Sequence, residues 1–151
     1  LVGDYLYGKF FFFLSEAGIL NLLDPLAEII CQIHEGGLLK KKLTRQVPPS
    51  KAFREVVRKE TATLFAGCCS LAALLTDAAP EDRESMRCYG LNLGMAYGLL
   101  EHGIPMEHAS TYLVEALNSL SSVSAGPERT LLEKLVHNLY RQGLPVRRMV
   151  I

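Results

Sequence analysis

The sequence lacks a net charge, because its 151 residues include 16 acids and 16 bases. A nucleic-acid-binding domain gathers Lys and Arg on one face to neutralise phosphates, and here basic residues cluster only at 40–45. We therefore expect no nucleic-acid partner. Since 49% of the residues are apolar, the chain can bury enough surface to offset its ordering entropy, which predicts one folded domain over residues 1–151.

A long apolar run is also lacking. The longest runs are residues 10–14 and 64–75, the second about 12 residues long, whereas a membrane-spanning helix needs about 20. Asp4 and Lys9 interrupt the region where a signal peptide would be continuously apolar. These observations predict a cytoplasmic protein without a transmembrane segment.

No CxxC pair is present among the four cysteines, Cys31, Cys68, Cys69 and Cys88. The adjacent pair cannot close a disulfide of normal geometry. Because all four lie in apolar, helix-like surroundings, we expect reduced thiols that act as small buried side chains.

Period-two alternation, the pattern of a half-buried strand, is absent too, and the apolar residues recur with helical spacing. The sequence therefore predicts an all-α fold with helices over residues 2–18, 22–42, 51–76, 80–102, 105–121 and 127–142. Prolines 25, 80, 105 and 127 mark four helix starts, each followed within three residues by an acid. Ser50 is the expected N-cap of the third helix, whose small apolar residues place it near the centre of a bundle.

No complete active site can be assembled from the residues alone. The densest acids, Glu81, Asp82 and Glu84, follow Pro80 in the first turn of a helix, where they favourably oppose the helix dipole. The four histidines lack metal-binding spacing, and no nucleophile elbow or phosphate-binding loop is present. We predict no catalytic residue and no metal ligand.

Three stretches carry a resemblance. The first is Gly3-Asp4-Tyr5-Leu6, followed at the expected distance by Glu35-Gly36; the second is residues 53–75; the third is residues 90–97, which contain Gly90-Leu91-Asn92-Leu93-Gly94. Taken in order, they resemble the "GDYL", "KTAALF" and "GxxLGxAFQIxDD" helices of the trans-isoprenyl diphosphate synthases, the polyprenyl synthetase family. The resemblance extends over residues 1–102 and implies a truncated, isoprenoid-synthase-like bundle of about six helices.

The family's diphosphate-binding lysine aligns with Glu60 in the second stretch, and Lys59 is displaced from it by one position, about 100° around a helix. Thr61 matches the threonine that follows. The resemblance thus implies that Lys59 and Thr61 are the remnant of a substrate site for isoprenyl diphosphates.

The family's aspartate-rich motifs are not matched. The first would lie upstream of Leu1, and the two leading aspartates of the second align with Glu101 and His102, followed by Gly103 and Pro105. The resemblance implies that this chain alone holds no cofactor, and that Mg²⁺ enters only if the protein is complete or paired with a catalytic subunit. The last 45 or so residues resemble the family's C-terminus, without the helices that precede it.

Three functional hypotheses follow from the resemblance. The first is a non-catalytic or regulatory subunit of an isoprenyl diphosphate synthase, similar to the small subunits of two-component heptaprenyl-type synthases. The second is an active, Mg²⁺-dependent polyprenyl diphosphate synthase whose aspartate-rich segments are absent from this chain. The third is a structural helical module that binds no diphosphate.

Association is expected as well, because a shortened bundle would leave central helices uncovered. We predict a homodimer, or a heterodimer with a catalytic subunit, burying upward of about 2,000 Å². The expected contacts are a small-residue face (Ala66, Ser70, Ala73) and the phenylalanines at 10–13. The basic residues 40–45, Arg147 and Arg148 are expected to be solvated helix ends or contacts with an anion or a partner.

Overall fold

The computed structural model describes residues 1–42 and 49–142, and within them it contains helices and no strand. In chain order the elements are α1 (Val2–Glu16), the 3₁₀ turn η1 (Leu20–Leu22), α2 (Leu23–Lys42), α3 (Lys51–Val57), the π turn η2 (Arg58–Ala62), α4 (Thr63–Leu75), α5 (Pro80–Glu101), α6 (Met106–Leu120) and α7 (Pro127–Gln142). Since α3, η2 and α4 follow one another without a break, they form one long helix. The all-α prediction and its six helices are confirmed.

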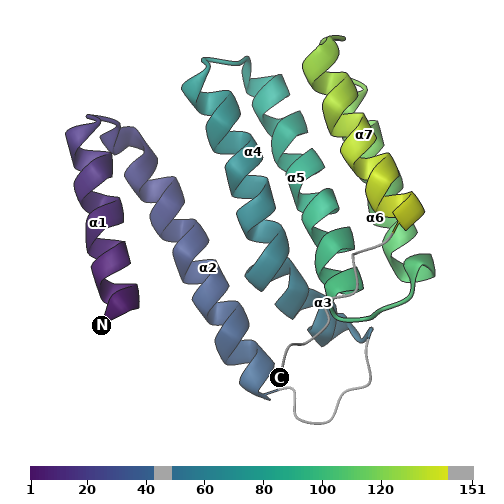
Figure 1. Ribbon diagram of the computed structural model, residues 1–151, viewed down its shortest axis with the longest axis horizontal. Helices are drawn as coiled ribbons and strands as arrows, with labels where there is room; N and C mark the ends of the chain where they lie inside the picture. The colour runs from purple at the N-terminus through teal and green to yellow at the C-terminus, as the bar shows by residue number, and fades with distance from the viewer. Residues whose placement is uncertain (43–48, 143–151) are drawn as a thin grey trace.

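The helices lie side by side, with α1 at one edge, α2 and α4 next, and α5 followed by α6 and α7 (Figure 1). α4 packs between α2 and α5, as the prediction of a central third helix requires. One core cluster joins α5, α6 and α7 around Tyr89, Leu93, Leu113, Leu120 and Val136. The second surrounds Val57, Ala62, Met95, Leu99 and Ile104.

The predicted cap and proline positions explain where the helices begin. The Ser50 hydroxyl accepts a hydrogen bond from the Phe53 backbone N–H at 3.1 Å, so Ser50 is the N-cap of α3. Pro80 and Pro127 are the first residues of α5 and α7, where a missing N–H costs nothing. Pro105 lies one position earlier, at the N-cap of α6, and Pro25 lies within the first turn of α2. Among the described residues no helix is long and apolar enough to cross a membrane.

The π turn is the departure from the predicted uniform helix over 51–76. Between Arg58 and Ala62 the helix widens to admit one additional residue. The buried Thr63 hydroxyl has the Arg58 carbonyl 3.0 Å away and the Gln32 side-chain oxygen 3.2 Å away, so its single proton can be donated to either. Through Gln32, this hydroxyl can link the wide turn to α2.

Three glycines spaced four residues apart let α5 approach the long helix closely. A Cβ atom at Gly90 would lie 2.4 Å from the Phe65 carbonyl oxygen, and one at Gly94 would lie 2.7 Å from the Ala62 Cα. A Cβ at Gly98 would lie 2.6 Å from a methyl group of Val57. Side chains at these positions would push the two helices apart.

The expectation that the cysteines are buried is wrong for Cys31 and Cys68, which are exposed. Cys69 and Cys88 are half-buried, and all four are free thiols. Apolar neighbours in sequence do not determine which side of a helix is covered, and Cys68 shares a side of α4 with the exposed Leu64 and Leu75. Burial of Cys69 raises the pKa of its thiol to about 11.

The predicted small-residue contact face is also wrong. Ala66 and Ala73 are already buried within the chain, at 7% and 8% exposure, and Gly90 of α5 approaches the Ala66 Cα. Ser70 is half-buried and donates to the Gly67 carbonyl. The phenylalanines at 10–13, with exposures from 37% to 59%, remain accessible to contact with another chain.

Candidate functional site

The residues around the displaced lysine face α2. Gly36 of α2 leaves space for them, because a Cβ there would lie 2.9 Å from both Lys59 Cβ and Glu60 Cγ. The Lys59 ammonium is 2.7 Å from a Glu35 carboxylate oxygen, and the Lys40 ammonium is 3.1 Å from a Glu60 carboxylate oxygen. Two ion pairs therefore join α2 to the π turn. In one pair α2 supplies the acid, Glu35, and in the other it supplies the base, Lys40.

The less exposed partner of each pair belongs to the π turn. The Lys59 side chain is 19% exposed against 61% for Glu35, and Glu60 is 22% exposed against 54% for Lys40. Because Glu35 already neutralises the Lys59 ammonium, an anion that approaches Lys59 must compete with this carboxylate. The sequence did not identify Glu35 and Lys40 as partners, since nothing in one sequence pairs positions twenty or more residues apart.

Thr61 faces a different neighbour. A Cβ at Gly98 of α5 would lie 3.2 Å from the Thr61 Cβ, so this threonine lies against α5. Lys59 and Thr61 therefore occupy one turn of the long helix but contact different helices, with Glu60 between them.

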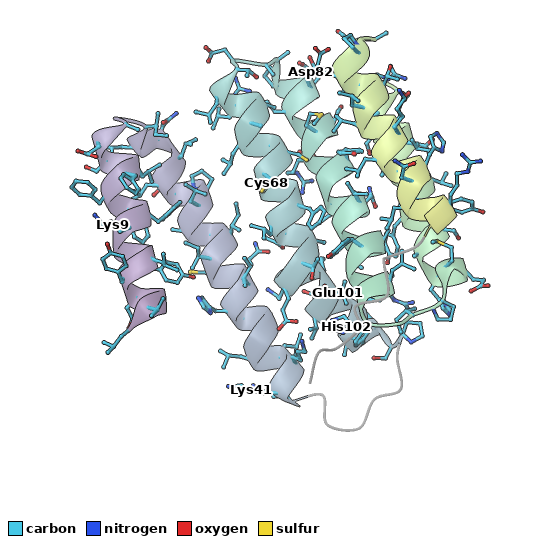
Figure 2. All side chains as sticks on the ribbon, viewed as in Figure 1. Lys9, Lys41, Cys68, Asp82, Glu101 and His102 are labelled. Atoms are coloured by element: carbon cyan, nitrogen blue, oxygen red, sulfur yellow. The ribbon has the colours of Figure 1, made fainter. Side chains whose placement is uncertain are left out.

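Glu101 and His102 lie at the end of α5 (Figure 2). The His102 ring packs edge to face on Phe53 of α3, with ring centres 5.3 Å apart. Phe53 precedes Lys59 by six residues, which places the two ends of the site roughly 9 Å apart along the helix at about 1.5 Å per residue. The structure thus brings His102 to the long helix, but at a different level from Lys59.

The helix containing Glu101 and His102 cannot continue. The N–H groups of Gly103 and Ile104 donate to the carbonyls of Leu100 and Leu99, and Gly103 has φ +73°. This is a left-handed helix end, which favours glycine. Over residues 1–42 and 49–142 no group of three or more His, Cys, Asp or Glu side chains could hold a metal ion.

An apolar groove of about 390 Å³ separates α1 from α2. Leu6 and Phe10 of α1, Ile30 and Ile33 of α2 and Leu64 of α4 are among its walls. Beside the groove, the Tyr7 hydroxyl of α1 lies 3.3 Å from His34 Nε2 of α2, so a polar contact also joins the two helices. The basic residues Lys40, Lys41 and Lys42 form the last turn of α2, whereas Arg45, Arg147 and Arg148 lie outside the described residues.

Comparison with known proteins supports the resemblance. The family model described as "Polyprenyl synthetase" matches residues 1–101. The chain is 28% identical over 102 residues to an octaprenyl diphosphate synthase of Escherichia coli, covering 67% of this chain and 32% of that protein. It is 32% identical over 103 residues to a geranylfarnesyl diphosphate synthase of Natronomonas pharaonis, covering 64% of this chain and 30% of that protein. The chain thus spans about a third of the length of these curated relatives.

Solved structures share the fold. A decaprenyl diphosphate synthase from Rhodobacter capsulatus superimposes with a TM-score of 0.83 at 16% identity, over 96% of this chain and 66% of that one. A polyprenyl synthase from Roseobacter denitrificans gives a TM-score of 0.82 at 20% identity, over 93% of this chain and 69% of that one. Since the family model covers two thirds of the sequence and the helical arrangement agrees, the chain belongs to the polyprenyl synthetase family.

Proposed function

We propose that the chain acts in isoprenoid biosynthesis as a non-catalytic or regulatory subunit of an isoprenyl diphosphate synthase. The observation that carries this proposal is the end of α5, which finishes at Glu101 and is followed by Gly103 in the left-handed conformation. By the resemblance, Glu101 and His102 align there with the two leading aspartates of the family's second aspartate-rich motif. Mg²⁺ prefers several oxygen ligands in octahedral geometry. One carboxylate beside an imidazole packed on Phe53 does not fit that requirement.

The experiment is a prenyl-transfer assay with isopentenyl diphosphate, an allylic diphosphate and Mg²⁺, using the 151-residue chain alone and then with a catalytic synthase subunit. We expect no turnover by the chain alone and a changed rate or product length when it is added to the catalytic subunit. Turnover by the isolated chain would refute the proposal.

A second candidate is an active polyprenyl diphosphate synthase that carries its aspartate-rich segments outside this chain. The observation favouring it is that the chain spans about a third of its curated relatives. The intact mass of the natural protein separates the two candidates. A mass near 16.7 kDa favours the subunit, and a mass near twice that value favours the enzyme.

We infer that Lys59, with Thr61, is what remains of a diphosphate site. The π turn supports this assignment, because it inserts one additional residue where Lys59 is displaced by one position. A bound diphosphate would compete with Glu35 for the Lys59 ammonium. Replacing Glu35 with Gln should therefore strengthen binding of an allylic diphosphate in calorimetry, and Lys59→Gln should weaken it. Lys41→Gln, at an exposed site in the same region, is the matched control.

We propose further that α1 takes part in a homodimer or in a heterodimer with a catalytic subunit. Leu14 is the one buried residue of α1, and the phenylalanines at 10–13 are exposed beside the apolar groove. Sedimentation at micromolar concentration should show a dimer, and Phe12→Glu should convert it to a monomer. A folded wild-type monomer, or a dimer unaffected by Phe12→Glu, would contradict this role of α1.

A further inference from the structure

A second, basic hollow lies between α3, α5 and α6 and has a volume of about 260 Å³. Its basic wall is built by Lys51, Arg54 and Arg58, which recur every three or four residues and so share one side of the long helix. Its apolar wall is built by Leu91 and Met95 of α5 and by Tyr112 of α6. The hollow therefore combines cationic groups with a small apolar surface.

The acid in this hollow is already paired. Glu55 accepts hydrogen bonds of 2.8 Å and 2.6 Å from the Arg58 guanidinium, and these bonds lower the pKa of its carboxyl. Lys51 and Arg54 have no hydrogen-bond or ion-pair partner in the described part of the chain, and Arg54 is half-buried. Two positive charges beside the hollow thus have no anion among residues 1–42 and 49–142.

The hollow is separate from the candidate diphosphate site. Lys59 and Glu60 contact α2 through Glu35 and Lys40, whereas Lys51, Arg54 and Arg58 face α5 and α6. A ligand in the hollow would leave the Lys59–Glu35 pair undisturbed.

We propose that the hollow binds a small phosphorylated molecule, with its phosphoryl group on Arg54 and Lys51 and its apolar part against Leu91, Met95 and Tyr112. The Arg guanidinium matches the geometry of phosphoryl oxygens, and the Lys ammonium adds a point charge. The volume is slightly below the roughly 300–1,000 Å³ of sites for drug-sized ligands, which limits the apolar part to a few atoms or one ring. Binding in this hollow does not require the proposed function of the chain, and it is expected whether or not the chain is a synthase subunit.

The test uses phenyl phosphate and inorganic phosphate as probes, titrated into the 151-residue chain and followed by calorimetry and by backbone amide NMR shifts. We expect phenyl phosphate to bind more tightly than inorganic phosphate, with the largest shifts at residues 51–58 and 91–95. Arg54→Gln should weaken phenyl phosphate binding about tenfold, since one charge-assisted interaction is lost. Binding should also weaken with added salt.

The matched control is Arg87→Gln on α5, because Arg87 is already engaged by Glu84 and does not line the hollow. It should leave binding unchanged. The amide shifts at residues 91–95 report on the hollow alone, because these residues line it and Lys59 does not. The proposal is overturned if no binding is seen at millimolar concentration, if both probes bind equally, or if Arg54→Gln, shown to be folded by circular dichroism, leaves the shifts at residues 91–95 unchanged.

Discussion

Replacing Gly90 with Ala tests the close approach of α5 to the long helix. The new Cβ would lie 2.4 Å from the Phe65 carbonyl oxygen and 2.9 Å from the Ala66 Cα, and backbone atoms cannot rotate away as a side chain can. Overpacking of this kind costs about 1–3 kcal/mol, whereas Gly→Ala inside a helix gains up to about 1 kcal/mol. We therefore expect the variant to lose about 1–2 kcal/mol of unfolding free energy. Urea denaturation followed by circular dichroism at fixed protein concentration measures this loss.

The control is Gly37→Ala in α2. A Cβ there would have its nearest contact at 3.7 Å, an ordinary van der Waals distance to a Glu60 oxygen. Only the gain in helix propensity should remain, so Gly37→Ala should raise the unfolding free energy by up to about 1 kcal/mol. Equal stability of the Gly90→Ala variant and the wild type would refute the close packing described for α5.

Three further outcomes follow from the structure. Thr63→Val should destabilise the protein by about 1–2 kcal/mol in urea denaturation, because the Arg58 carbonyl and the Gln32 side-chain oxygen lose the Thr63 hydroxyl as a donor. A thiol-reactive dye at pH 8 should modify the exposed Cys68 much faster than Cys69, because burial raises the pKa of the Cys69 thiol to about 11. Equal modification rates would show that Cys69 is accessible. Hydrogen bonds from Arg87 and Cys88 lower the pKa of Glu84 from 4.5 to about 2, so the stability contributed by this carboxylate is present above pH 4.5 and is lost as the pH falls toward 2. An NMR titration should show the low pKa, and Arg87→Gln should raise it.

Much of the fold could be predicted because helix signals are local. Ser50 and the prolines at 80 and 127 fix helix starts through groups a few residues away, so those boundaries agree with the structure. The π turn could not be found this way, since one additional residue hardly alters the average apolar spacing over the 25 residues from Lys51 to Leu75. The four-residue spacing of Gly90, Gly94 and Gly98 was an available signal for close helix packing.

The candidate site was less predictable, because its geometry depends on contacts between distant segments. The pairing of Lys59 with Glu35 and the packing of His102 on Phe53 both join residues from separate helices. The predicted burial of Cys68 is wrong for the same reason, since burial depends on which neighbours cover each side of α4. Sequence periodicity identifies a covered side only after the neighbours are known.

The π turn has a consequence for how this helix can evolve. Because a wide turn accommodates one more residue in about the rotation of an ordinary turn, loss of a single codon within Arg58–Ala62 would restore a regular helix without rotating α3 relative to α4. Phe53 would stay on His102 and Phe65 on α5, whereas the side chains within the turn would change the neighbours that they face. The number of residues in the wide turn thus sets which of its own side chains meet α2 and which meet α5, and it leaves the contacts on either side of the turn in place.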